Sequence, residues 1–166
     1  VAGDRFADLI ADVRKDSTIK AVVLRVNSPG GSVVASSKIK TELDLLRESV
    51  PVIASYGNYA ASGGYWISAN TDKILSNATT LTGSNGVFSM IPDVSGALKN
   101  KLHVNVTTVN SNAHSDLYSL IKPLDAAETA YMQASVENIY ERFTSIVAEG
   151  RDMTVEAAHM VVPCLS

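Results

Sequence analysis

Apolar and polar residues alternate along the chain in two rhythms, one typical of helices and the other of strands. Residues 4–16 repeat apolar positions three and four apart, which predicts an amphipathic helix. The short apolar run KAVVLRV, residues 20–26, predicts a buried strand. Helical spacing returns over residues 33–48, and a strand-like run, VIASYG, follows Pro51. The chain therefore begins as helix, strand, helix, strand.

The same alternation continues toward the C-terminus. We predict a short helix in ASGGYWISAN, a strand in DKILS, an amphipathic helix in VSGALKNKL and a period-two strand in HVNVTTV. A long helix begins at Asp125, whose side chain can cap the first turn while Glu128 reaches back to it. Its predicted apolar stripe consists of Met132, Val136, Ile139, Phe143 and Ile146.

Strands separated by helices indicate the α/β class, with a mostly parallel sheet covered on both faces by helices. A length of 166 residues with 46% hydrophobic content predicts a single domain, residues 1–166. The chain opens on a helix without a preceding strand and closes on a short apolar tail, so we expect a fragment of a longer protein. The apolar runs are well short of the roughly 18 residues that a membrane span needs.

Charge and cysteine content exclude several classes of function. The net charge of −3 and the lack of a basic stripe argue against a nucleic-acid partner. The single cysteine, Cys164, can form neither an internal disulfide nor a site of several thiolates for a metal. We therefore expect no metal and no other cofactor.

The candidate chemistry gathers in three glycine-bearing turns, NSPGGS at 27–32, AASGGY at 60–65 and LTGSNG at 81–86. The first two turns each leave a strand, and such loops converge on one crevice of a parallel sheet. Paired glycines expose backbone N–H groups, as an oxyanion hole requires, which makes Gly30 and Gly31 candidate donors. Ser62 enters a predicted helix, where the positive end of the helix dipole would stabilise a developing oxyanion.

Each turn also has an ordinary structural interpretation. A serine before two glycines is common in turns and at helix N-caps. The stretch AASGG is not the G-x-S-x-G elbow of α/β-hydrolases, because Ala60 occupies the position two before the serine. Taken singly, the turns leave open whether Ser62 is a nucleophile or a small turn residue.

Taken together, LRVNSPGGSV, YAASGGYWIS and TLTGSNGVFS, in this order and spacing, closely resemble the signal peptide peptidase SppA (protease IV) family of membrane-associated serine proteases. Residues 127–154 are similar to the long helix and following turn of that family, so the resemblance covers nearly the whole chain. It implies a ClpP/crotonase-like fold, with Ser62 as nucleophile and Gly31 and Gly63 among the oxyanion donors. It also implies cleavage of hydrophobic peptides such as spent signal peptides, association with the bacterial cell envelope, and a homo-oligomer.

The resemblance further implies a lysine as general base. A lysine can take this role in a buried site because desolvation lowers its pKa, so that it loses its proton near neutral pH. In short family members the lysine follows a segment resembling NSNAHSD, where this chain has Ser115. In long members the serine lies in the C-terminal half, which this chain resembles, and the lysine in the N-terminal half. We therefore expect the base to come from the N-terminal half of the same protein. Ser84 matches the family serine that hydrogen-bonds the lysine amine, although a plain turn serine would look alike.

Three alternatives stay open. Lys122 is an in-chain candidate for the base, although a solvated surface lysine is the more ordinary interpretation. A Ser-His-Asp triad would use His114 and Asp116, close neighbours in a polar loop whose side chains we expect to diverge. The ClpP proteases carry their histidine where this chain has Val87 and its neighbours. The third interpretation is a non-catalytic scaffold half of a larger assembly.

Four apolar residues flank the predicted site. Such side chains would favour extended hydrophobic peptides over charged ones, but they could equally belong to the core. The four residues are Val33, Val34, Tyr65 and Trp66.

Overall fold

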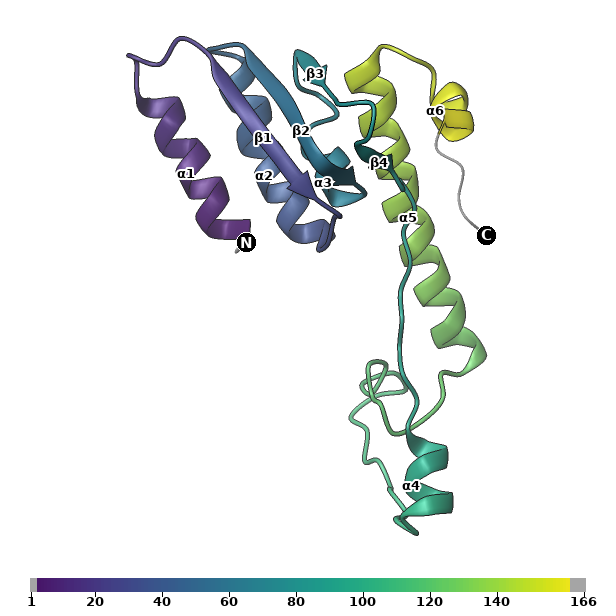
Figure 1. Cartoon of the computed structure of the whole chain (residues 1–166). Helices are drawn as coiled ribbons and strands as arrows, with labels where there is room; N and C mark the ends of the chain where they lie inside the picture. The colour runs from purple at the N-terminus through teal and green to yellow at the C-terminus, as the bar shows by residue number, and fades with distance from the viewer. Residues whose placement is uncertain (1–2, 162–166) are drawn as a thin grey trace. The chain divides into compact units, whose positions relative to one another are not determined.

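The computed structural model describes residues 3–161 (Figure 1). Internal contacts divide the chain into two compact units. The first unit contains the residues up to Gly86 together with those from Tyr140 on, and the second contains Val87–Ile139. This division is finer than the single domain expected from length. Cys164, which the sequence analysis singled out, lies outside the described residues.

The first unit is built on a parallel sheet of four strands. The central strand β2 pairs with β1 on one edge, and with β3 and then β4 on the other. β3 pairs with residues 53–55 and β4 with residues 59–61 of β2, so the two short strands follow one another along the same edge. Every pairing is parallel, as the alternating pattern predicts. The strands are β1 (Val22–Ser28), β2 (Val52–Ala61), β3 (Lys73–Leu75) and β4 (Leu81–Gly83).

Two helices, α1 (Gly3–Lys15) and α2 (Val33–Arg47), pack against each other on one face of β1 and β2 (Figure 1). α2 starts at its N-cap Ser32, whose hydroxyl accepts a hydrogen bond from the N–H of Ala35. The core lies between these helices and the sheet. It consists of Ile10, Leu24, Val26, Ile39, Leu43, Leu46, Val52, Ala54, Tyr56 and Ala60.

Strand β1 is buried on one face only, which corrects the prediction of a buried strand in a sheet with helices over both faces. Leu24 and Val26 point into the core, whereas Val23 is 66% exposed and Arg25 is also exposed. An apolar run cannot by itself distinguish burial on one face from burial on two. Along β1, the described helices cover a single face of the sheet.

The C-terminal part of the first unit supports the loop that follows β2. α3 (Gly63–Trp66) is a single turn, and the ring of Trp66 packs on Phe143 of α5 (Ala126–Arg151) with centroids 4.7 Å apart. The Arg151 guanidinium donates hydrogen bonds to the carbonyl of Ala69 at 2.9 Å and to that of Thr71 at 2.8 Å. α6 (Val155–Val161) follows.

The second unit contains α4 (Ser95–Lys101) and the N-terminal half of α5. The predicted capping box is confirmed: the Asp125 carboxylate accepts from the Glu128 N–H at 2.8 Å, and the Glu128 carboxylate accepts from the Asp125 N–H at 3.0 Å. Of the predicted stripe on α5, Phe143 and Ile146 are buried, and the members nearer the N-terminus are half-buried.

The predicted strand HVNVTTV is wrong. Residues 103–109 have no regular structure, and Val109 is 98% exposed. A strand needs a neighbouring strand to bond its backbone N–H and C=O groups, and period-two alternation of side chains does not supply one. Within residues 3–161 no strand pairs with this segment. Over the same range, no helix combines the length and the apolar character needed to cross a membrane.

Candidate active site

Ser62 lies at a sharp junction between β2 and α3, with φ 51° and ψ −118°. A positive φ is uncommon for any residue but glycine, and such outliers cluster at functional sites. Its N–H donates to the Gly83 carbonyl at 2.8 Å, and its carbonyl accepts from the Trp66 N–H at 2.9 Å. Ser62 thus lies at a sharp strand–turn–helix junction, as the serine of a nucleophile elbow does, although Ala60 replaces the first glycine of the usual elbow motif.

The two glycines after Ser62 carry the signal that could have revealed the junction. A Cβ on Gly64 would lie 2.7 Å from the Ser28 carbonyl oxygen, and one on Gly63 would lie 2.6 Å from the Ser36 hydroxyl. The contact with the Ser28 backbone leaves no room for a larger residue at position 64, and one at position 63 would require the Ser36 side chain to shift. α3 thus packs against the end of β1 and the start of α2 through its glycines. Paired glycines directly after a strand indicate such a close approach.

The turn containing Gly30 and Gly31 lies in contact with Ser62. A Cβ on Gly30 would lie 2.6 Å from the Ser62 Cβ and 2.9 Å from the Gly63 nitrogen. A Cβ on Gly63 would lie 3.3 Å from the Gly31 nitrogen. Both turn glycines have positive φ, 109° and 147°, which favours glycine there. The first two glycine turns therefore meet, and they bring backbone N–H groups beside the serine.

The helix after Ser62 is shorter than the sequence indicates. α3 ends at Trp66 after four residues, so few peptide dipoles are aligned behind the serine. The predicted stabilisation by a helix dipole is therefore small. Individual N–H groups of the turns are the stronger source of positive potential at this position.

The third glycine turn is tied to the same junction through Gly83, which accepts the Ser62 N–H. Ser84 follows it, is exposed and has φ 50°. The next residue, Asn85, is 5% exposed, and its side-chain oxygen has no hydrogen-bond partner within the described part of the chain. Three turns from distant parts of the sequence thus converge around one serine.

The four apolar residues that flank the turns differ in accessibility. Val34 is 66% exposed, while Val33 and Tyr65 are half-buried, and burial raises the pKa of the Tyr65 hydroxyl. Trp66 is only 2% exposed and stacks on Phe143, so it is a core residue here. Trp66 is therefore removed from the expected peptide contact, which stays a prediction for Val33, Val34 and Tyr65.

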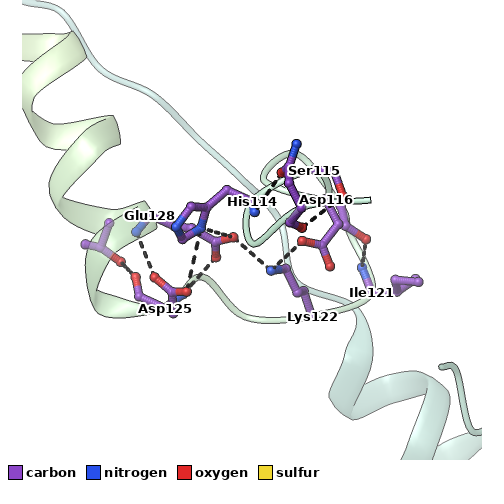
Figure 2. A network of polar contacts seen from close by, with 10 residues as sticks. His114, Ser115, Asp116, Ile121, Lys122, Asp125 and Glu128 are labelled. Carbon is purple, nitrogen blue, oxygen red and sulfur yellow. Dashed lines mark hydrogen bonds and ion pairs between the residues drawn. The ribbon is translucent and has the colours of Figure 1, made fainter. Parts of the chain in front are cut away.

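The second unit contains Lys122, the in-chain candidate for the base (Figure 2). Its Nζ lies 2.8 Å from a carboxylate oxygen of Asp116 and 2.8 Å from one of Glu128. Both ion pairs raise the pKa of Lys122, to about 12, and the pair with Asp116 has the larger effect. A general base must instead lose its proton near neutral pH. Lys122 is therefore held in the charged form, the form unsuited to that role.

The side chains of His114 and Asp116 diverge, as expected for neighbours in a polar loop (Figure 2). The His114 Nδ1 lies 3.4 Å from a Glu128 oxygen and 4.0 Å from one of Asp125, whereas Asp116 pairs with Lys122. Lys122 lowers the pKa of both Asp116 and Glu128. The His–Asp contact that a catalytic triad needs is not formed between these two residues.

The cluster of His114, Asp125 and Glu128 has ligand atoms within 4.8 Å of one another. Both carboxylates are nevertheless used in the capping box, and the Lys122 ammonium contacts the Glu128 oxygen that would face a metal. A second cation beside this ammonium would be repelled. The arrangement fits an ion-pair network better than a metal centre.

Comparison with known proteins supplies the family. The profile described as Peptidase family S49 matches residues 44–161, a range that includes both Ser62 and Ser84. The chain belongs to peptidase family S49. It is 44% identical over 157 residues to "Protease 4" of Salmonella typhi, an alignment that covers 94% of this chain and 25% of that protein.

Two further relatives show similar coverage. "Protease 4" of Haemophilus influenzae is 40% identical over 153 residues, with 92% of this chain and 25% of the relative covered. "Serine protease SPPA, chloroplastic" of Arabidopsis thaliana is 32% identical over 157 residues, with 94% and 23% covered. The S49 chain thus spans about a quarter of the length of these relatives. The family and the names of these relatives indicate that the chain is part of a protease.

Proposed function

We propose that the chain is the nucleophile-bearing domain of a serine endopeptidase of the SppA type, with a ClpP/crotonase-like fold. The observation that carries the proposal is the contact between the Gly30–Gly31 turn and Ser62, whose backbone adopts a strained elbow conformation. A nucleophile must lie beside backbone N–H groups that can stabilise the oxyanion formed in acyl transfer. Membership of a peptidase family supports this assignment.

In this proposal the Ser62 Oγ attacks the peptide carbonyl while a base removes its proton. The carbonyl oxygen becomes an oxyanion that accepts hydrogen bonds from the N–H groups of Gly31 and Gly63. Gly30, the other expected donor, already donates its N–H to the Ser28 hydroxyl at 3.2 Å, so its part in the proposal is the shape of the turn. Collapse of the tetrahedral intermediate breaks the C–N bond, and the protonated base returns the proton to the leaving amine. Water then hydrolyses the acyl-enzyme by the same route.

The base in this proposal is a lysine outside the chain, in the N-terminal half of the same protein. Two observations support it: Lys122 is held as an ammonium by Asp116 and Glu128, and the three relatives described above are about four times as long as the matched region. Ser84 would accept a hydrogen bond from the lysine amine, since it directly follows Gly83, the acceptor for the Ser62 N–H.

The proposed substrates are hydrophobic peptides such as cleaved signal peptides. The exposed Val34 and the half-buried Val33 and Tyr65 lie on the elements that begin directly after the glycine turn and Ser62, and offer apolar surface to an extended peptide. Membrane association in the bacterial cell envelope and assembly into a homo-oligomer belong to the same proposal, and rest on the likeness to SppA proteins.

A fluorophosphonate probe tests the nucleophile, because it modifies an activated serine hydroxyl. In the full-length protein we expect one labelled site, which mass spectrometry locates at Ser62 and which Ser62→Ala removes. Ser76→Ala is the matched control, because Ser76 is an exposed serine of the same unit. Labelling that survives Ser62→Ala, or a protein that is never labelled and cleaves no peptide, would overturn the proposal.

A further inference from the structure

The pairing of β1 with β2 changes register just before the glycine turn. Val22 to Val26 pair in sequence with Val52 to Tyr56, but the next pair is Ser28 with Ala60. Between these pairs β1 contributes one residue, Asn27, and β2 contributes three, residues 57–59. β2 therefore carries an extended bulge opposite Asn27, which leaves backbone groups outside the regular ladder.

The side chain of Asn27 occupies this bulge. Its Oδ1 accepts hydrogen bonds from the N–H of Asn58 at 3.0 Å and of Tyr59 at 3.1 Å. A Cβ on Gly57 would lie 2.8 Å from the same oxygen, so only glycine leaves room for it. On the other edge of β2, the Thr80 hydroxyl donates to the Gly57 carbonyl at 2.7 Å. Side chains thus replace the ladder bonds that the bulge breaks.

The bulge decides which residues of β2 lie beside the end of β1. Without it, the register of Val26 with Tyr56 would continue and place Ser28 opposite Asn58. The two-residue shift moves β2 by about 6.6 Å along the strand and returns each side chain to its original face. Ser28 consequently lies beside Ala60, two residues before Ser62, and Gly30 contacts Ser62.

We propose that Asn27 is a positioning residue for the nucleophile: its amide oxygen holds the β2 bulge and thereby sets the glycine turn against Ser62. The inference rests on the proposed function of Ser62. The Asn27 side-chain oxygen bonds to the N–H groups of Asn58 and Tyr59, and not to Ser62 or the proposed oxyanion donors, so it acts through the strand register. Displacement of catalytic groups by about 1 Å can reduce rates by about 10²-fold.

The test uses the full-length protein and three variants. Asn27→Ala removes the acceptor, and we expect kcat to fall by about 10²-fold with a much smaller change in KM, because geometry and not affinity is lost. Asn27→Asp retains an oxygen at the same place and should recover turnover to within about tenfold of the parent. Arg25→Ala is the matched control: it also removes β1–β2 hydrogen bonds, to Ser55 and Tyr56, but outside the bulge.

Amide hydrogen exchange of Asn58 and Tyr59 separates this inference from the proposed function. Both amides should exchange faster in Asn27→Ala and stay protected in Asn27→Asp. Full turnover in Asn27→Ala, or equal loss in Asn27→Ala and Asn27→Asp, would overturn the positioning role. If Asn27→Ala does not fold, Gly57→Ala crowds the same oxygen and must reproduce the loss of kcat. A parent protein that is unlabelled at Ser62 and cleaves no peptide would instead refute the proposed function, while exchange would still report on the bulge.

Discussion

The backbone of Ser62 is held in a conformation that costs about 1–3 kcal/mol, and two hydrogen bonds compensate for it. The Gly83 carbonyl accepts from its N–H, and the Trp66 N–H donates to its carbonyl. Gly30 adds a steric limit, because any side chain at that position would meet the Ser62 Cβ. The serine is thus fixed by backbone contacts, and its hydroxyl makes no capping bond with α3.

The residue whose role is most open to a direct test is Lys122. We expect Lys122→Met to lower the melting temperature, because it leaves the Glu128 carboxylate, 1% exposed, without its ammonium partner. Lys15→Met, which removes a surface pair with Asp12, should have little effect. Peptide turnover by the folded full-length variant should remain near the parent value, and loss of turnover without loss of folding would reinstate Lys122 as the base.

The pH dependence of stability gives a second measurement on the same network. The pKa of Glu128 is lowered from its ordinary value near 4.5, so its contribution is present above that pH and is lost as the pH falls through the folded value. The raised pKa of Lys122 contributes below its ordinary 10.5, and that contribution is lost as the pH rises through about 12. Thermal unfolding should therefore depend less on acid pH in Lys122→Met than in the parent.

Single elements differ in how far the sequence determines them. The capping box of α5 was predictable because Asp125 and Glu128 are three residues apart and satisfy each other locally. The irregular structure of residues 103–109 was not predictable, because an alternating segment becomes a strand only where a partner strand is available. Nor was the β2 bulge, since its bonds join Asn27 to residues about thirty positions away. Trp66 was misassigned for the same reason, because its partner Phe143 is remote in the sequence.

The C-terminal end of α5 should prove important for stability through Arg151. Arg151→Ala leaves the buried carbonyls of Ala69 and Thr71 without their donor, at a cost of about 2–4 kcal/mol in the free energy of unfolding. Arg142→Ala, on the same helix, removes only an exposed cation 6.0 Å from the Trp66 ring and should cost less than about 1 kcal/mol. Urea unfolding measures both, and equal costs would contradict the assigned role.

At the scale of the whole molecule, the order and spacing of the three glycine turns predicted the family that the comparison confirms. The parallel α/β sheet also followed from the pattern of helices and strands. The division into two units did not, because the boundary near Gly86 carries no linker composition and α5 contributes to both units. The contact of Gly30 with Ser62 depends on strand register, which hydrophobic pattern specifies only to within a two-residue step.

The proposed division of the catalytic groups predicts the behaviour of the 166-residue chain by itself. It should show at most trace peptidase activity, because general-base assistance contributes about 10²–10⁴-fold. Adding the upstream half of the protein should restore turnover of a hydrophobic peptide, and Ser62→Ala should abolish it again. Robust hydrolysis by the isolated chain would contradict a base located outside it.

The loop after Ser62 is supported by residues that come much later in the sequence, which has a consequence for synthesis on the ribosome. Trp66 packs on Phe143, and Arg151 donates hydrogen bonds to the carbonyls of Ala69 and Thr71. Translation proceeds from the N-terminus, and folding follows it as segments emerge. The serine and both glycines of its turn emerge well before the helix whose side chains support the loop behind them. A nascent chain should therefore carry the proposed nucleophile on a loop that lacks its support, and we expect the junction to be completed only after Arg151 has left the ribosome. The order of residues along the chain would thus delay assembly of the proposed active site until nearly all of this region has been made.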